Sequence, residues 1–202
     1  MFCDRHDAGK QMGAALKHSA GKDVLILGIP RGGVEVGCQV AEELSAEFSM
    51  LVVRKLPFPD NPESGFGAIA EDGSVYLHPE AASWLSPKDI DFIVHEQKKE
   101  IIRRIRVLRS GSPLPDMKGR HVILVDDGIA MGSTMQAAVM CCRNLKAKKI
   151  TVAAPVASPN AVRLAAASAD EVVTLLLPPG STLSPTTTRT GTTCPTRRSY
   201  RF

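Results

Sequence analysis

The feature that most constrains the fold is a repeated alternation between short, continuous apolar runs and segments with helical spacing. Five apolar runs bounded by turn residues are KDVLILGIP from Lys22, SMLVVRKL from Ser49, HVILVDDG from His121, KKITVAAPVA from Lys148 and EVVTLLLP from Glu171. Continuously apolar strands are typical of sheets buried on both faces, and the intervening helices favour parallel crossovers. The sequence therefore predicts an α/β protein with a parallel five-stranded sheet in one domain, residues 1–177.

The regular alternation is interrupted between about Pro57 and Lys118. The segment GAIAEDGSVYL, residues 67–77, has the pattern of a hairpin that turns at Asp72 and Gly73. Residues 87–109 have apolar side chains at helical spacing and predict one long helix. We expect an inserted α+β subdomain here. The many cations of its helix form either a solvated face or a lid over an anionic ligand.

Composition narrows the class of protein. With 44% hydrophobic and 23% charged residues, the chain is typical of a water-soluble globule. No apolar run reaches the roughly 20 residues that span a bilayer, and we recognise no secretory leader. The five cysteines lack C-x-x-C spacing, which indicates reduced thiols without a zinc site. We therefore expect a cytoplasmic protein and no membrane partner.

The positive net charge does not indicate nucleic acid binding. Four of the 25 Lys and Arg residues lie in residues 178–202, which contain no acids, so residues 1–177 hold 21 basic and 21 acidic residues. Binding to a phosphate backbone needs a basic face, which a neutral body does not supply. A nucleic acid partner is therefore not expected.

The stretch VILVDDGIAMGST, residues 122–134, carries the clearest chemistry. Asp126 and Asp127 follow a buried strand, and two carboxylates there can accept hydrogen bonds from a vicinal diol. Gly132, Ser133 and Thr134 follow at the start of a predicted helix, where amide N–H groups and hydroxyls bind phosphate. The pattern predicts a receptor for ribose 5-phosphate. The alternative is a solvent-exposed strand end before a well-capped helix.

This stretch resembles the binding motif of the type I phosphoribosyltransferases, which use phosphoribosyl pyrophosphate (PRPP). ILGIPRGGVEVG, LVVRKLPFPDNPESGFGAI and the segment order resemble one uncharacterised bacterial branch of that family, over about residues 4–177. The resemblance implies a Rossmann-like sheet. It also implies that the candidate catalytic residues Asp126 and Asp127 hold the ribose hydroxyls, without acting as nucleophiles. The 5-phosphate is then wrapped by Ala130, Met131, Gly132, Ser133 and Thr134.

The segment GIPRGG supports the same interpretation. Gly32 and Gly33 permit a ligand to approach the backbone closely, and the guanidinium group of Arg31 can donate paired hydrogen bonds to a polyphosphate. Alone it predicts only a strand-to-helix turn, but in the family this loop holds pyrophosphate. Arg54 and Lys55 end the second apolar run, where we expect them to meet the same anion. The alternative for this pair is surface charge.

The resemblance implies transfer of phosphoribose from PRPP to a nitrogenous acceptor, with release of pyrophosphate. Mg²⁺ would chelate pyrophosphate and ribose hydroxyls and keep several waters, so no direct protein ligand is expected. The acceptor is unknown, and family relatives commonly form homodimers. One alternative is a regulator that senses PRPP without turnover. Another, a response-regulator-like domain built on the acid pair, leaves the glycine turn unexplained.

Several features depart from the family pattern. Met131 stands where most relatives have a threonine hydroxyl, and Ala130 where hypoxanthine–guanine enzymes have an aspartate. None of the five histidines has ligand spacing, and we assign none a catalytic role. The Thr- and Arg-rich residues 178–202 resemble nothing in the family. We hypothesise either a disordered tail or a shifted reading frame near Pro179, because the shifted frame permits an acidic, aromatic ending typical of this branch.

Overall fold

The computed structural model describes residues 2–21 and 23–177. Both hypotheses for residues 178–202 therefore lie outside the described residues. Within the described part, no helix combines the length and the apolar character that crossing a bilayer requires.

The main sheet has five parallel strands in the order β2-β1-β6-β7-β8. In chain order they are β1 Val24–Gly28, β2 Glu47–Met50, β6 His121–Val125, β7 Lys149–Val156 and β8 Glu171–Leu176. β1 is buried along its whole length and β6 along all but its first residue, as continuously apolar sequences require. The predicted fold class, an α/β protein with a parallel five-stranded sheet, is confirmed.

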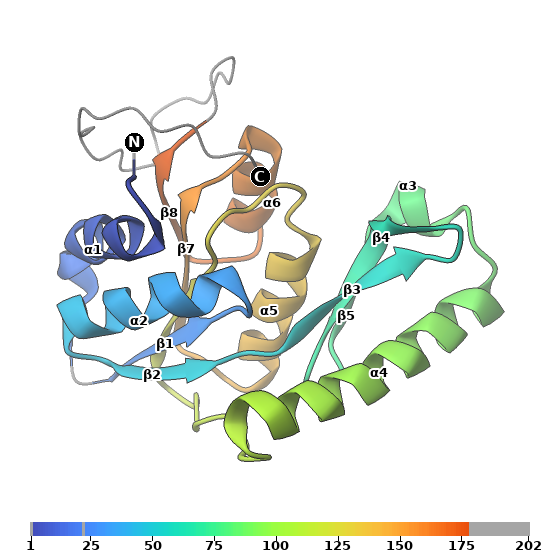
Figure 1. Ribbon diagram of the computed structural model, residues 1–202, viewed down its shortest axis with the longest axis horizontal. Coiled ribbons are helices and arrows are strands. Elements are labelled where there is room, and N and C mark those ends of the chain that lie inside the picture. Colours follow the sequence, from blue (N-terminus) through green and yellow to red (C-terminus); the bar gives the residue numbers. More distant parts are fainter. Residues whose placement is uncertain (1, 22, 178–202) are drawn as a thin grey trace.

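Two helices cover each face of this sheet (Figure 1). One face is covered by α1 Arg5–Ala15 and α2 Gly32–Leu44. A short 3₁₀ turn, η1 Lys17–Ser19, follows α1. The other face is covered by α5 Ser133–Asn144 and α6 Pro159–Ala166. The helical spacing between the apolar runs predicted α2, α5 and α6 but not α1. Its apolar residues are too few for a clear stripe, although Met12 and Leu16 are completely buried.

A second, antiparallel sheet extends away from the first, and a long helix lies along it (Figure 1). Its elements are β3 Val53–Phe58, β4 Asn61–Ala70, β5 Val75–Leu77, α3 Pro79–Ala82 and α4 Pro87–Arg109. The predicted turn at Asp72 and Gly73 and the predicted bounds of the long helix are confirmed. The predicted apolar stripe of α4 packs onto this sheet through Ile90, Ile93, Val94, Ile101, Ile105 and Leu108.

The run SMLVVRKL is not one strand, as predicted, but passes from one sheet to the other. The Leu51 amide still donates to Gly28 of β1 at 3.1 Å, whereas Val53 already pairs with Ala70 of β4. Both sheets bury their apolar residues, so the sequence stays apolar through the change. The second sheet consequently begins at Val53, before the expected insert boundary at Pro57.

A buried ion pair holds this changeover together. Arg109, at the end of α4, donates to Glu71 Oε1 at 2.5 Å and to the Met50 carbonyl at 2.9 Å. Glu71 Oε2 accepts from the Val52 amide at 2.8 Å. The side chains of Arg109 and Glu71 are each only 6% exposed. The pair thus satisfies backbone groups that neither sheet pairs where the chain leaves β2.

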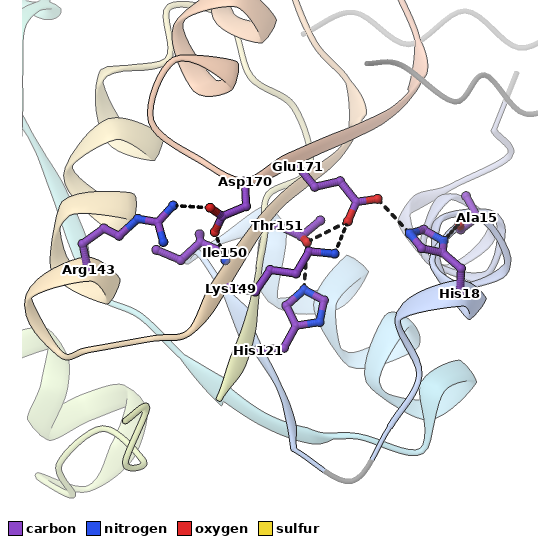
Figure 2. Close-up of polar contacts among 9 residues, drawn as sticks. All are labelled: Ala15, His18, His121, Arg143, Lys149, Ile150, Thr151, Asp170 and Glu171. Atoms are coloured by element: carbon purple, nitrogen blue, oxygen red, sulfur yellow. Dashed lines mark hydrogen bonds and ion pairs between the residues drawn. The ribbon is translucent and has the colours of Figure 1, made fainter. Parts of the chain in front are cut away.

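A polar network ties the amino ends of β6, β7 and β8, at the edge opposite the carboxyl ends of the strands (Figure 2). Glu171 accepts from Lys149 and is bonded to His18, both at 2.7 Å. His121 contacts the Thr151 hydroxyl at 2.8 Å. Two of the histidines that have no assigned catalytic role therefore lie in this network.

Candidate functional site

The two sequence motifs meet at the carboxyl ends of neighbouring strands. Gly28, the last residue of β1, pairs in register with Val125, the last residue of β6. From this edge the chain leaves β1 through α2 toward β2, and leaves β6 through α5 toward β7, in opposite directions along the sheet. Parallel α/β sheets bind ligands at such a switch in strand order. The loops after β1 and β6 therefore define the candidate site.

Asp126 lies at the end of β6 with its carboxyl group largely withdrawn from solvent. Burial raises the pKa of Asp126 to about 8; the hydrogen bond from the Asp127 amide to Oδ1, at 2.8 Å, opposes this shift, and the negative charge of Asp127 adds to it. Near pH 7 the free protein therefore carries Asp126 mainly as the neutral acid. The repulsion expected between adjacent carboxylates is relieved by a proton.

Residues 130–134 form a turn that leads into α5. Gly132 has a φ of 87°, a conformation that glycine adopts without strain, and α5 begins there without a side-chain cap. The Ser158 hydroxyl anchors the turn by donating to the Ala130 carbonyl at 2.6 Å. The first amides of α5 are thus available for an anion. Met131 is 63% exposed beside them.

The loop after β1 lies tightly against the acid pair. A Cβ on Gly32 would lie 1.8 Å from Asp127 Oδ2, and one on Gly33 would lie 2.6 Å from the Val125 carbonyl. The Pro30–Arg31 peptide is cis, and Arg31 is exposed. α2 also starts without a side-chain cap, whereas side chains cap α1, α4 and α6. The uncapped starts of α2 and α5 both face the site.

A cavity of about 260 Å³ opens between the β6–α5 loop and the second sheet. It is lined from the main domain by Asp126 and residues 128–135, and from the second sheet by Lys55, Glu63, Gly65 and Gly67. Asp127 and the loop Arg31–Gly33 adjoin it without lining it. No sequence pattern indicated Glu63, Gly65 or Gly67, because only the fold of β3 and β4 turns them toward the cavity.

The structure corrects the expected position of Arg54 and Lys55. They lie on β3 of the second sheet, not at the end of a main-sheet strand, and alternation along a strand sends them to opposite faces. Arg54 Nε donates to Gln97 on α4 at 3.1 Å, while Lys55 reaches the cavity and donates to the Glu63 carbonyl. Arg54 is therefore directed away from the site. The cations of α4 do not line the cavity either, which favours a solvated face over a lid.

One contact that the sequence analysis missed involves Arg5, at the start of α1. Its Nε and Nη2 lie 2.9 Å and 2.8 Å from Asp127 Oδ2. The two residues are 122 positions apart, so no local sequence pattern links them. Asp127 is thus compensated by a cation, as Asp126 is by a proton.

The described residues contain no group of three or more His, Cys, Asp or Glu side chains placed to hold a metal ion. Mg²⁺ in phosphate-transferring sites keeps several waters and binds through substrate phosphates with one or two carboxylates. The loops at the starts of α2 and α5 fit an ion held mainly by the substrate and water, with Asp126 and Asp127 bonded to the ribose hydroxyls.

Comparison with known proteins agrees with this geometry. Residues 9–176 match the family model described as "Phosphoribosyl transferase domain". The chain is 41% identical over 180 residues to two Mycobacterium tuberculosis proteins, "Putative phosphoribosyl transferase Rv0571c" (strain H37Rv) and "Putative phosphoribosyl transferase MT0597" (strain CDC 1551). Each match covers 88% of this chain but 41% of the relative, so the chain spans about two fifths of those proteins.

Among solved structures, the crystal structure of TT1426 from Thermus thermophilus superposes with a TM-score of 0.75 at 36% identity. That match covers 93% of this chain and 90% of the other. The fold and the site thus define an α/β protein whose candidate ligand site lies at the switch point of a parallel sheet. More specifically, the chain belongs to the phosphoribosyltransferase family.

Proposed function

We propose that this protein binds PRPP and transfers its phosphoribosyl group to a nitrogenous acceptor, with release of pyrophosphate. The observation that carries the proposal is the contact between the Asp127 carboxylate and Gly32. It joins the acid pair, suited to a ribose diol, to the loop Arg31–Gly33, suited to pyrophosphate. The anomeric carbon that links ribose to pyrophosphate would then lie between them.

Each part of the site has one role in this proposal. Asp126 and Asp127 accept hydrogen bonds from the ribose hydroxyls, and residues 130–134 hold the 5-phosphate through the first amides of α5. Arg31, Gly32 and Gly33 hold the pyrophosphate, and Lys55 supplies a cation from the opposite wall. Arg54, which bonds to Gln97, has no role. When bound, Mg²⁺ would neutralise charge on the leaving pyrophosphate.

The reaction forms one bond and breaks one at the anomeric carbon. The acceptor nitrogen donates its electron pair to that carbon, the bond to pyrophosphate oxygen breaks, and pyrophosphate leaves with those electrons while the acceptor loses its proton. The protein contributes mainly position and charge compensation. The cytoplasmic location and the homodimer expected from the sequence are part of this proposal.

A PRPP-sensing regulator without turnover is a second candidate, and Met131 favours it. Its exposed thioether lies in the 5-phosphate turn and offers no hydrogen-bond donor. Such a turn would hold the substrate less firmly during the reaction. The sensor would use the same acid pair and the same loops.

Release of pyrophosphate separates the two candidates. The protein is incubated with PRPP, Mg²⁺ and a panel of purine, pyrimidine and other nitrogenous acceptors. Release with one acceptor, lost in the variant carrying both Asp126→Asn and Asp127→Asn, supports the enzyme. Binding of PRPP by calorimetry without release across the panel supports the sensor, and no binding by the wild type would refute both.

A further inference from the structure

Arg5 contacts the acid pair from a part of the chain that neither motif includes. It precedes residues 9–176, which match the family model, yet its guanidinium makes the ion pair with Asp127 described above. The Arg5 side chain is 54% exposed and that of Asp127 28%. Ion pairs this exposed contribute little to stability. Stability alone therefore gives no strong reason for a cation at this position.

A helix cap and close packing against α2 fix the start of α1, and with it the position of Arg5. Asp4 caps the helix by accepting from the Asp7 amide at 2.8 Å. Gly9 and Gly13 lie so close to α2 that a Cβ on either would stand 2.5 Å from a side-chain Cβ there. This close packing fixes the axis of α1 against the helix that begins at Gly32. Arg5 and the loop Arg31–Gly33 thus belong to one rigid pair of helices.

The contact also fixes how the Asp127 carboxylate is presented. Both Arg5 nitrogens lie on Oδ2, and the same oxygen lies against Gly32. A carboxylate has about four acceptor positions on its two oxygens. Because both bonds from Arg5 go to Oδ2, Oδ1 keeps acceptor positions for a hydroxyl group, although it also lies near Gly32. An unrestrained aspartate would lose rotamer freedom when it met the diol.

We propose that Arg5 is a positioning residue of the PRPP site, which holds the Asp127 carboxylate for the ribose hydroxyls. The inference rests on the proposed function and extends it to a residue outside both motifs. Arg5 acts through Asp127 and does not contact the pyrophosphate. It follows that Arg5 matters equally for any ligand that presents the ribose diol, with or without pyrophosphate.

Calorimetric titration with PRPP and with ribose 5-phosphate tests this. Arg5→Ala is expected to weaken both ligands by a similar factor, about tenfold. Arg5→Lys, which restores the charge, recovers part of the loss. Lys10→Ala removes an exposed cation further along α1 and leaves both affinities unchanged. Thermal melting shows that each variant is folded, and if Arg5→Ala does not fold, Arg5→Lys alone must weaken both ligands equally.

A double-mutant cycle shows whether the effect of Arg5 on affinity depends on Asp127. If Arg5 acts through Asp127, Arg5→Ala causes no further loss in the Asp127→Asn background, with PRPP titrated to millimolar concentrations. Additive losses, loss for PRPP alone, tighter binding or unchanged affinity would each refute the inference. If Asp127→Asn abolishes all binding, the single variant Arg5→Ala decides. Equal losses of affinity for PRPP and ribose 5-phosphate support the inference, and unequal losses refute it. Failure of the wild type to bind PRPP would refute the proposed function itself.

Discussion

Gly32 and Asp127 lie in direct contact, with no room between them for even one methyl group: a Cβ on Gly32 would stand 1.8 Å from Oδ2 and 2.2 Å from Cγ. Because Gly32 begins α2 and Asp127 follows β6, this single contact sets the spacing between the parts of the site proposed to bind the ribose diol and the pyrophosphate.

Gly32→Ala should therefore abolish or strongly weaken PRPP binding while the protein stays folded. Alanine is well tolerated in a helix, so the cost falls on Asp127, which must rotate away from its present position. We expect affinity to fall about tenfold or more, measured by calorimetry. Gly21→Ala is the matched control, because a Cβ there meets nothing within 4 Å. Unchanged affinity in Gly32→Ala would mean that the contact is not needed for binding.

Met131→Thr should tighten PRPP binding. The substitution places a hydroxyl at an exposed position of the turn 130–134, the proposed 5-phosphate site, where a hydrogen bond to a charged phosphate oxygen should give about a tenfold gain. Calorimetry measures the change, and the same variant should release pyrophosphate faster if the protein is an enzyme. Met140→Thr, at a partly exposed methionine on α5, should leave the affinity for PRPP unchanged. A weaker affinity in Met131→Thr would show that the thioether itself contacts the ligand.

Asp126→Asn should stabilise the free protein at alkaline pH. Folded Asp126 keeps its proton up to a pKa of about 8, whereas the unfolded chain loses it near pH 4. Between these values the folded state binds more protons, so the contribution of Asp126 to the free energy of unfolding falls as pH rises. Asparagine does not titrate, so the variant should not lose stability through this group as pH rises.

Chemical denaturation at pH 5 and pH 8.5 checks this. The advantage of Asp126→Asn should grow by the order of 4 kcal/mol between pH 5 and pH 8.5, because each pH unit between the two pKa values costs about 1.4 kcal/mol. Asp91→Asn, at an exposed position on α4, serves as the control. An advantage that does not grow between the two pH values would contradict a neutral, buried Asp126.

Glu71→Gln should destabilise the protein without touching the site. The change leaves the guanidinium of Arg109 buried without its counter-charge, which costs about 3–5 kcal/mol in comparable cases. The free energy of unfolding by denaturant measures the loss. Glu96→Gln, which removes an exposed partner of Lys99, should cause no measurable loss. A stability equal to that of the wild type would mean that the two sheets do not depend on this pair.

Local patterns were sufficient for much of the fold. Continuous apolar runs predicted β1, β6, β7 and β8 of the main sheet but not the bounds of β2, and the periodicity of residues 87–109 predicted α4 with its buried stripe. Asp126 and residues 130–134 could be recognised because they are contiguous, and a strand end followed by a helix start is a local arrangement. The geometry of that stretch follows from backbone conformation and capping, which nearby residues control.

Other features required the tertiary structure. The run SMLVVRKL is equally apolar in both sheets, so only the pairing partners of Leu51 and Val53 decide where the chain changes sheet. That change, in turn, directs Lys55 to the cavity and Arg54 to α4.

The sequence by itself determined the alternating α/β order, the long helix and the acidic motif, because each depends on residues within about one helix or strand of one another. Only the tertiary structure brought Arg5 to Asp127 and Gly32 against the same carboxylate. Such contacts between distant segments depend on how helices pack on the sheet. Backbone periodicity does not encode that packing.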